Sequence, residues 1–492
     1  MNIKKILIAN RSEIASRIIF TCKSLNIKTV AIYSKQDSQL PFVFQADQNY
    51  KLEKEGSLAY LEQDEIIDIA KKFKVDAIHP GYGFLSENYN FAQKVINSGI
   101  KWIGPSPKII KKMGDKINAR KIMQKNNIPI IPGKLISCDE NEKVIKKISE
   151  KIGFPLILKD PLGGGGKGIK KVYNSEELIP AFNIVKSETS RLTKTKQILI
   201  EKYIEKAKHI EVQIAGDGKN FIHLYERECS VQRRHQKIIE EAPCNFIEKK
   251  ILNKIYNSAI NSAKAINYNN IGTVEFIVTP NEFYFLEMNT RLQVEHSVTE
   301  QTTGIDLVEL QIEIAQNQKL EIKQKDIKQN NHSIECRIYS ENPENNFIPS
   351  TGRIKNLIIP NVPFCRVDHN LNEKMEIPVF FDPMLAKITT WGKNRDKTIK
   401  NMLLFLNKLK IEGIKTNIEF LKKILNSKKF LSGKINTQSI EKNEIKIYKT
   451  AKKQNTEDEK EIALIISTIL LDQKENNQNS CKTNKWRIQQ WQ

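Results

Sequence analysis

Short apolar runs alternate with amphipathic stretches along the first 110 residues of the chain. The runs have the length and the flanking loop residues of buried strands: KKILIAN, KTVAIYS, VDAIHP and IKWIGPS. The stretches between them include EIASRIIFTCKSL and NYNFAQKVINSG, whose apolar residues recur at helical spacing, and Ser86 is a suitable N-cap for the second. Such alternation predicts a parallel sheet covered by helices on both faces. Ligands of such sheets bind at the carboxyl ends of strands, here ILIANRSE and AIHPGYG.

From about residue 114 the pattern predicts hairpins mixed with helices. HIEVQIAG and FIHLYERE are joined across Asp217-Gly218, a strong signal for a tight turn. From about residue 330 further strands are expected at SIECRIYS, GRIKNLIIP, RVDHN and LAKITTWG. NRDKTIKNMLLFLNKL then has the pattern of an amphipathic helix, and TEDEKEIALIISTILLDQK predicts another helix within 446–492. The chain is therefore expected to be an α/β protein with several domains.

The stretch LEMNTRLQVEH, Leu286 to His296, alternates strictly between polar and mostly apolar residues. Period-two alternation predicts extended chain with one buried face. Its polar face carries Glu287, Asn289, Arg291, Gln293 and Glu295, and either faces water or lines an active site.

A hairpin is predicted in TVEFIVTPNEFYFLEMN, with its turn at Pro280-Asn281-Glu282. If it is centred on Asn281, Glu275 and Glu287 face each other, with Cβ atoms about 5 Å apart. Two such carboxylates repel unless a proton or a cation lies between them, and Asn289 adds an oxygen on the same side. Two carboxylates and an amide suit a hard cation of the Mg²⁺–nucleotide kind. The alternative is two solvated acids on an exposed sheet face.

The run GGGGKG, residues 163–168, lies between PLILKD and IKKVYN, which read as strands. A dinucleotide-binding loop would be followed by a helix, and a P-loop by Lys-Ser or Lys-Thr, so neither pattern fits. A strand–glycine–strand hairpin predicts a flap whose bare amides can close over phosphates. The alternative is a mobile surface loop.

Charged residues are dense in ERECSVQRRHQKIIEEAP, residues 226–243, which contains Arg233, Arg234, His235 and Lys237. Such a run is usually a solvated face. It can equally supply cations to an oxyanion substrate.

The whole chain has 79 Lys and Arg against 57 Asp and Glu, a formal charge of +22. The lysines are scattered and accompany a general richness in Ile and Asn, so we expect anionic substrates and acidic partners rather than nucleic acid. The 7 cysteines are far apart and form no C-x-x-C pair, which predicts a reduced, cytoplasmic protein. The N-terminal apolar run is too short for a signal peptide, and no apolar run reaches membrane-spanning length.

Taken together, these runs resemble the biotin carboxylases. The resemblance is carried by HPGYGFLSEN, MGDKINARKIM, GGGGKG, ERECSVQRRHQKIIEEAP, FLEMNTRLQVEHSVTE and IECRIYSENP, and it extends to about residue 440. It implies an N-terminal Rossmann-like domain (1–113), an ATP-grasp domain (114–329) with a lid at about 132–203, a C-terminal domain (330–445) and an extension (446–492). It also implies carboxylation of biotin with MgATP, or MnATP, and bicarbonate.

The resemblance assigns most of the nucleotide site by position. Phosphate contacts fall on Lys116, Lys159 and the loop glycines Gly163, Gly164, Gly165, Gly166 and Gly168. Residues that bracket adenine or otherwise contact the nucleotide fall on Glu201, Lys202, Tyr203, Ile204, His209 and His235; for the histidines, structural hydrogen bonding is the alternative. Glu275 and Glu287 belong to both the ATP site and the metal site, and Asn289 completes the metal ligands.

The reaction centre follows in the same way. Bicarbonate would be held by Lys237, Arg291, Gln293 and the amide of Val294, with Glu295 as the general base. Arg337 would contact biotin, and Tyr82 is a weaker candidate there, with core packing as the alternative.

Several positions depart from the family pattern. Asp160-Pro161-Leu162 replaces small residues before the glycines, Ala207-Lys208 replaces Pro-Arg, and Ser297 replaces proline. None of these changes removes a proposed catalytic group.

The chain contains no A-M-K-M-like biotinylation site and no segment for a carboxyltransferase. Biotin is therefore expected on a separate carrier protein, with a separate carboxyltransferase and a homodimeric biotin carboxylase. Acetyl-CoA carboxylase is the first choice for the whole enzyme, and propionyl-CoA or pyruvate carboxylase the alternative. A basic nucleic-acid-binding protein with a decayed ATP site is the distant alternative.

Overall fold

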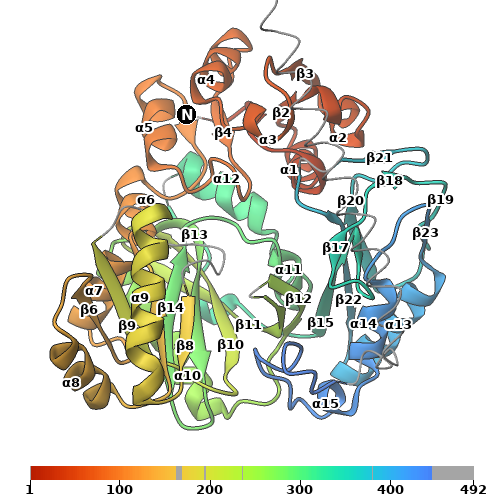
Figure 1. The fold of residues 1–492 in the computed structure, drawn as a ribbon. Coiled ribbons are helices and arrows are strands. Elements are labelled where there is room, and N and C mark those ends of the chain that lie inside the picture. Colours follow the sequence, from red (N-terminus) through yellow and green to blue (C-terminus); the bar gives the residue numbers. More distant parts are fainter. Residues whose placement is uncertain are drawn as a thin grey trace, which may run out of the picture. The chain divides into compact units, whose positions relative to one another are not determined.

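The computed structural model describes residues 2–161, 169–192, 196–234, 236–317, 319–378 and 381–445 (Figure 1). Three of the sequence predictions lie outside the described residues: the glycine run 163–168, His235 and the helix within 446–492.

The N-terminal part forms the predicted parallel sheet, with strand order β3-β2-β1-β4-β5 (Figure 1). Its strands are β1 (Lys5–Ile8), β2 (Lys28–Tyr33), β3 (Gln48–Lys51), β4 (Ala77–His79) and β5 (Lys101–Trp102). Its helices include α1 (Ser12–Ser24), α2 (Pro41–Gln45), α3 (Gly56–Ala59), α4 (Gln63–Lys72) and α5 (Tyr89–Asn97). The sheet confirms the fold class, but Ser86 as N-cap of α5 is wrong. The side chain of Asn88 caps that helix, since it accepts a hydrogen bond from the backbone N–H of Phe91.

The largest sheet is antiparallel, with order β14-β13-β10-β11-β12-β15-β22-β20. Its strands are β10 (Lys208–Asp217), β11 (Phe221–Arg233), β12 (Gln236–Ala242), β13 (Asn269–Val278), β14 (Phe283–Asn289), β15 (His332–Tyr339), β20 (Cys365–His369) and β22 (Met384–Gly392). The turn predicted at Asp217-Gly218 joins β10 to β11. Because β12 pairs with β15, this sheet contains strands from both sides of the domain boundary predicted between residues 329 and 330.

A smaller antiparallel sheet has the order β6-β9-β7-β8. It consists of β6 (Gly133–Ser137), β7 (Leu156–Lys159), β8 (Ile169–Val172) and β9 (Gln197–Lys202), accompanied by α8 (Glu142–Ile152) and α9 (Ser175–Leu192). Its own apolar core includes Ile136, Leu158, Phe182 and Ile198. Lys159 pairs with Ile169, so β7 and β8 flank the glycine run as two strands of a hairpin, as predicted.

The remaining elements complete residues 1–445. The helices are α6 (Pro107–Gly114), α7 (Lys116–Lys125), α10 (Lys249–Ala265), α11 (His296–Thr303), α12 (Leu307–Asn317), α13 (Arg395–Lys408), α14 (Ile418–Leu425) and α15 (Lys428–Leu431), with 3₁₀ turns η1 (Lys35–Asp37) and η2 (Gln324–Asp326). The short strands are β16 (Glu341–Asn342), β17 (Ile348–Pro349), β18 (Gly352–Arg353), β19 (Asn356–Ile358), β21 (Glu376–Ile377) and β23 (Lys410–Glu412). The predicted strand GRIKNLIIP is thus divided between β18 and β19.

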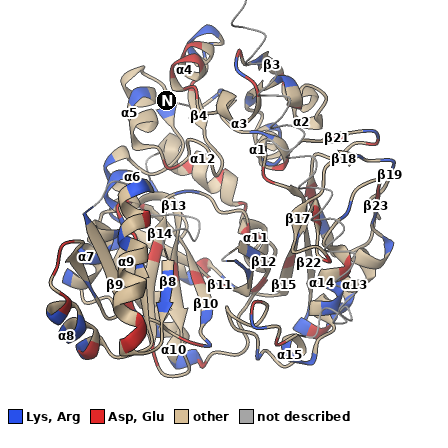
Figure 2. Ribbon diagram, in the orientation of Figure 1, with Lys and Arg blue, Asp and Glu red and all other residues tan. Residues whose placement is uncertain are grey.

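Lysines and arginines occur on elements throughout the described chain, α6, α8 and α15 among them (Figure 2). In the described ranges, no helix combines the length and apolar character needed to cross a bilayer.

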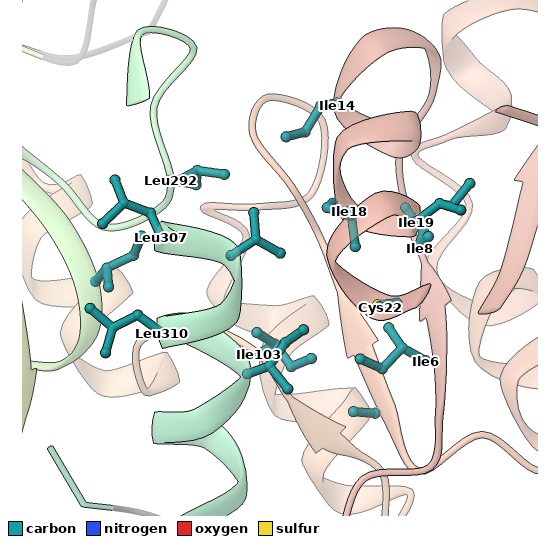
Figure 3. Packing of buried hydrophobic residues seen from close by; sticks show 14 of the residues in the cluster. Ile6, Ile8, Ile14, Ile18, Ile19, Cys22, Ile103, Leu292, Leu307 and Leu310 are labelled. Atoms are coloured by element: carbon teal, nitrogen blue, oxygen red, sulfur yellow. The ribbon is translucent and has the colours of Figure 1, made fainter. Parts of the chain in front are cut away.

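One apolar core joins the parallel sheet to the large antiparallel sheet (Figure 3). Ile14 and Ile18 on α1 share it with Leu307 on α12. Leu292, from the alternating stretch Leu286–His296, is fully buried in the same cluster. Leu292 therefore anchors the stretch in the core between the two sheets.

The extended conformation predicted for Leu286–His296 is correct only in its first part. Strand β14 ends at Asn289, residues 290–295 are irregular, and α11 begins at His296. The chain leaves the sheet because the backbone N–H of Thr290 donates to the carboxylate of Glu87 at 3.0 Å rather than to a neighbouring strand.

Candidate active site

A cavity of about 920 Å³ lies where the three sheets meet. Its wall includes the loops after β1 and β4, as expected for ligands at the carboxyl ends of parallel strands. Every predicted site residue that the structure describes lines it: Tyr82, Lys116, Lys159, Glu201, Lys202, Tyr203, Ile204, His209, Lys237, Glu275, Glu287, Asn289, Arg291, Gln293, Val294, Glu295 and Arg337. The structure therefore brings together predicted site residues that are spread along the chain from Tyr82 to Arg337.

The predicted pairing of Glu275 with Glu287 is confirmed by the register of β13 and β14. Next to Glu275 the register shifts, so that Phe276 faces Phe285 and the pairs nearer the turn are displaced by one residue. The irregularity lies between the turn and the two carboxylates. The pairing of Glu275 with Glu287 is therefore the one that the sequence predicts.

The two glutamates belong to a row of charged residues across the sheet. Arg227 on β11 faces Glu211 on β10, Glu211 faces Glu275 on β13, and Glu275 faces Glu287 on β14. Directly opposed residues on neighbouring antiparallel strands lie on one face of the sheet. Three adjacent carboxylates thus share one face of the sheet, where Glu275 and Glu287 line the cavity, and their mutual repulsion requires positive charge beside them.

Two nitrogen groups lie beside Glu275, the ammonium of Lys237 and the ring of His209. Nζ of Lys237 lies 2.9 Å from Oε1 of Glu275, and Nε2 of His209 lies 2.7 Å from its Oε2. Burial alone would raise the pKa of Glu275, but the charge of Lys237 and the hydrogen bond from His209 hold it well below its ordinary value. Glu275 is therefore ionised.

Glu287 has a different environment. Burial and the charge of Glu275 raise its pKa, although the charges of Lys116 and Lys237 oppose the shift. Asn289 lies on the same side, and its Nδ2 donates to Oε1 of Glu275 at 2.8 Å. A cation between Glu275 and Glu287 would relieve this repulsion, and carboxylate and amide oxygens are the donors that Mg²⁺ prefers. The three side chains fit such an ion.

Lys237 on β12 is the central cation of the cavity. Besides Glu275, its Nζ contacts Oε1 of Glu295 at 2.6 Å and a carboxylate oxygen of Glu211. The solvated-face alternative for residues 226–243 is wrong, because Arg227 and Glu240 are fully buried. The run forms the hairpin of β11 and β12, and β12 carries Lys237 to the cavity.

Glu295 lies between two cations. Nη2 of Arg337 donates to its Oε2 at 3.0 Å, opposite Lys237. Burial opposes ionisation of Glu295, but Lys237 and Arg337 hold its pKa well below the ordinary value. The same Nη2 lies 2.6 Å from Glu240, where burial raises the pKa to about 8. Glu295, an ionised carboxylate that lines the cavity, therefore lies close to Glu240, a buried carboxyl group with a raised pKa.

At the other end of the cavity, Glu201 holds two cations. Its carboxylate contacts Nζ of Lys159 at 2.8 Å and Nη1 of Arg120 at 2.6 Å. Nζ of Lys202 instead donates to the backbone carbonyls of Gly153 and Phe154, at 3.0 and 2.5 Å. The side chain of Glu201 thus orients a predicted phosphate ligand, Lys159.

The predicted histidine and the predicted biotin-side tyrosine both have structural partners. Nδ1 of His209 lies 2.6 Å from Nε2 of Gln232. The hydroxyl of Tyr82 donates to Glu13, and Nζ of Lys387 lies 5.8 Å from the centre of its ring. These contacts fix both rings beside the cavity.

Sequence reasoning gave no role to Arg120, Glu211, Arg227 or Lys387. Glu211 had a usable signal, because it lies two residues after His209 in an alternating strand and therefore on the same face. Lys387 has none, since it is 93 positions from Val294, whose carbonyl its Nζ reaches at 2.6 Å.

Sequence models of three families match successive parts of the chain. They are the biotin carboxylase N-terminal domain over residues 2–110, the ATP-binding domain of the carbamoyl-phosphate synthase L chain over 115–323, and the biotin carboxylase C-terminal domain over 335–442.

Two curated relatives match over nearly all of their own length. Biotin carboxylase 2 of Bacillus subtilis is 47% identical over 436 residues, 88% of this chain and 98% of the relative. A pyruvate carboxylase subunit of Methanothermobacter thermautotrophicus is 41% identical over 472 residues, 96% of each chain.

Solved structures agree. The biotin carboxylase domain dimer of Hydrogenobacter thermophilus 2-oxoglutarate carboxylase, in complex with MgADP, ADP and bicarbonate, has a TM-score of 0.86 and 40% identity, covering 91% of this chain and 99% of that one. The β,γ-ATP complex of Campylobacter jejuni biotin carboxylase has a TM-score of 0.85, also at 40% identity, covering 90% of this chain and 99% of that one. The matches extend through the sheets that form the cavity, and the chain belongs to the biotin carboxylase family of ATP-dependent ligases.

Proposed function

We propose that this chain uses MgATP and bicarbonate to carboxylate biotin attached to a separate carrier protein, and that the whole enzyme is an acetyl-CoA carboxylase. The observation that carries the first part is the contact of Lys237 with both Glu275 and Glu295. One ammonium group links the carboxylates suited to the nucleotide's metal with the carboxylate suited to proton removal. Phosphoryl transfer and bicarbonate activation are thereby adjacent.

Nucleotide phosphates fit the end of the cavity that contains Lys116 and Lys159. Lys159 is held by Glu201, so its ammonium is already placed before ATP arrives. Glu275, Glu287 and Asn289 would hold Mg²⁺, or Mn²⁺. When bound, the ion neutralises charge on the phosphates as the γ-phosphoryl group transfers. The solved relative with MgADP and bicarbonate supports this assignment.

Bicarbonate fits beside Lys237, Arg291, Gln293 and the amide of Val294. Glu295 takes its proton, and the resulting oxygen attacks the γ-phosphorus to give carboxyphosphate and ADP. Bicarbonate that draws Lys237 toward itself weakens the contact between Lys237 and Glu295. The proton affinity of Glu295 then rises at the moment when it must accept a proton.

Biotin is assigned to the side of the cavity that contains Arg337 and Tyr82. Arg337 is fixed by Glu240 and Glu295, so its guanidinium can orient a ureido group without losing much side-chain freedom. Biotin carboxylation by this chain requires delivery from the carrier, and a separate carboxyltransferase completes the reaction.

Acetyl-CoA is the acceptor that we propose, with malonyl-CoA as product. The Bacillus subtilis relative is named biotin carboxylase with no acceptor in its name and is compatible with acetyl-CoA, while the similarity to the Methanothermobacter pyruvate carboxylase protein keeps pyruvate as the alternative. The purified chain, combined with a biotinylated carrier and each candidate carboxyltransferase, should form malonyl-CoA. Formation of oxaloacetate but not malonyl-CoA would reverse the choice.

A homodimer is part of the proposal, because the Hydrogenobacter domain is a dimer. Phe20 on α1, Phe44 on α2 and Phe364 beside β20 are 70%, 68% and 53% exposed, and α1 contacts both α2 and β20. Large exposed aromatic residues on adjoining elements are typical of an interaction surface. Light scattering should show a dimer for the wild type and a monomer for the double variant Phe20→Ser with Phe44→Ser.

Bicarbonate-dependent ATP hydrolysis tests the reaction itself. Phosphate release should require bicarbonate and Mg²⁺, and free biotin should increase it. If biotin has no effect at any Mg²⁺ concentration, the chain is not a biotin carboxylase in function.

A further inference from the structure

Arg227 is a guanidinium group buried completely within the large sheet, next to the cavity. An arginine side chain has five N–H donors and no acceptor. Here the acceptors are Glu211, Gln213 and Thr273 from the sheet, Thr299 from α11, and Gln293 from the irregular segment. The group does not line the cavity, so it acts through its neighbours.

The contact with Arg227 determines the orientation of the side-chain amide of Gln293. Nη2 of Arg227 must meet the amide oxygen Oε1, because an arginine cannot accept a hydrogen bond from the NH₂ group. Nε2 of Gln293 is thereby turned toward the carboxylates, 2.8 Å from Oε1 of Glu275 and 3.4 Å from Oε2 of Glu211. The side of Gln293 that faces the reaction centre therefore presents N–H donors.

This orientation is required for an anion and is not guaranteed by the backbone. Gln293 lies in residues 290–295, which belong to no strand or helix. A rotation of the amide by half a turn would present its oxygen to the anion and replace attraction by repulsion. Arg227 opposes that rotation, since the rotated amide would direct its own N–H groups at the guanidinium.

Arg227 is itself immobilised from several sides. Its Nε donates to Oε1 of Glu211 at 2.5 Å, and its Nη1 donates to Gln213 and Thr299 at 2.8 Å each. A buried guanidinium with all its donors engaged cannot turn without leaving carboxylate or hydroxyl groups unpaired. The orientation imposed on Gln293 is therefore rigid before bicarbonate binds.

We infer that Arg227 is a positioning residue that presents the amide N–H groups of Gln293 to bicarbonate. The inference rests on the bicarbonate role of Gln293 in the proposed function. It adds a specific cause for bicarbonate recognition, located outside the cavity and 66 positions away along the chain.

A double-mutant cycle on Arg227→Lys and Gln293→Leu tests it. Lysine keeps the charge beside Glu211 but cannot form the fork that reaches all five acceptors. Arg227→Lys should raise the KM for bicarbonate about tenfold and change the KM for ATP by less than about twofold. In the Gln293→Leu background the same change should have no further effect on the bicarbonate KM, because the group that it orients is gone.

Arg395→Lys is the matched control. Arg395 is a buried guanidinium that binds Glu241 through Nε and Nη2 at 2.6 and 3.1 Å, and it does not line the cavity. Arg395→Lys should lower the stability of the protein without changing the KM for bicarbonate. If Arg227→Lys raises both KM values equally, or its effect multiplies with that of Gln293→Leu, Arg227 does not act through Gln293 and the inference is overturned.

The wild-type assay distinguishes failure of this inference from failure of the proposed function. If the proposed function is wrong, the wild type itself shows no bicarbonate-dependent ATP hydrolysis. Should Arg227→Lys not fold, the double variant Thr273→Val with Thr299→Val removes two acceptors of the guanidinium and keeps its charge. The bicarbonate KM should then rise about threefold with the ATP KM unchanged. An unchanged bicarbonate KM in that variant overturns the inference as well.

Discussion

The carboxylate of Glu87 accepts a 2.8 Å hydrogen bond from Nε of Arg291, although the two residues are 204 positions apart. Its other oxygen accepts from the backbone N–H of Thr290 at 3.0 Å. Nη2 of Arg291 donates in turn to Oδ1 of Asn289 at 3.0 Å. The loop after β4 thus holds Thr290 and Arg291 at the point where the chain leaves the large sheet. Its carboxylate also orients the guanidinium that we propose to bind bicarbonate.

Glu87→Gln should lower kcat for bicarbonate-dependent ATP hydrolysis about tenfold and leave the KM for ATP within about twofold. The amide keeps one acceptor but directs N–H groups at donors of Arg291 or Thr290. Asp64→Asn is the control, because Asp64 forms an exposed ion pair with Lys94 at 2.7 Å in the same part of the chain. Equal losses in the two variants would mean that Glu87 supports only the general fold.

Glu287→Gln should raise the Mg²⁺ concentration for half-maximal activity by about tenfold or more, because the site loses one of its two carboxylates. Without Mg²⁺ the variant should melt at a higher temperature than the wild type, since the repulsion from Glu275 is removed. Metal titrations and thermal melts with and without Mg²⁺ measure both effects.

The control for this change is Glu282→Gln, at the exposed turn of the same hairpin, where the carboxylate accepts a 2.8 Å bond from Tyr284. Its metal titration should match the wild type. A wild-type titration for Glu287→Gln would show that Glu287 is no metal ligand.

The hairpin explains why this part of the site was predictable. Register depends on a turn and on the period of two, both of which are local in sequence, so Glu275 could be paired with Glu287. The bulge beside Phe276 has no sequence signal, and it does not disturb the prediction because it lies on the turn side of the glutamates. By contrast, Ser86 and Asn88 are both good N-caps, and only the loop geometry decides for Asn88.

The contacts of Glu87 and Arg227 could not be predicted because they depend on how segments far apart in the sequence pair and pack. Alternation alone carries Leu286–His296 onward as a strand, whereas the bond from Thr290 to Glu87 ends it at Asn289. Charge density in residues 226–243 left open whether Arg227 faces water or the interior. Its burial follows from the acceptors that β10, β13 and α11 bring to it.

Glu240→Gln should change the pH dependence of stability. Burial raises the pKa of Glu240 to about 8, above its ordinary value near 4.5, although Arg337 opposes the shift. Between those pH values the folded protein holds a proton that the unfolded chain has lost, so this group makes folding less favourable as pH rises. Glutamine cannot ionise. Relative to wild type, the variant should therefore gain stability from pH 5 to 8, by at most about 1.4 kcal/mol per pH unit.

Glu241→Gln is the control of opposite sign. Burial would raise the pKa of Glu241, but the hydrogen bond from His332 and the charge of Arg395 lower it to about 2. Its stabilising contribution is complete above about pH 4.5 and is lost only as pH falls toward 2. Denaturant melts from pH 5 to 8 should show that Glu241→Gln lowers the free energy of unfolding by the same amount at every pH. A constant difference for Glu240→Gln as well would contradict its raised pKa.

Ser297→Ala should lower the free energy of unfolding by about 1–3 kcal/mol, because the hydroxyl of Ser297 donates to the buried carboxylate of Glu335. After the change, that oxygen keeps only the 3.2 Å bond from Thr389. Ser297→Pro should cost no more than alanine, since residue 297 lies in the first turn of α11, where proline is tolerated. Chemical denaturation measures both, with Ser190→Ala, an exposed serine bonded to a helix carbonyl, as the control. A loss for Ser297→Ala no larger than the control would show that Glu335 does not need this hydroxyl.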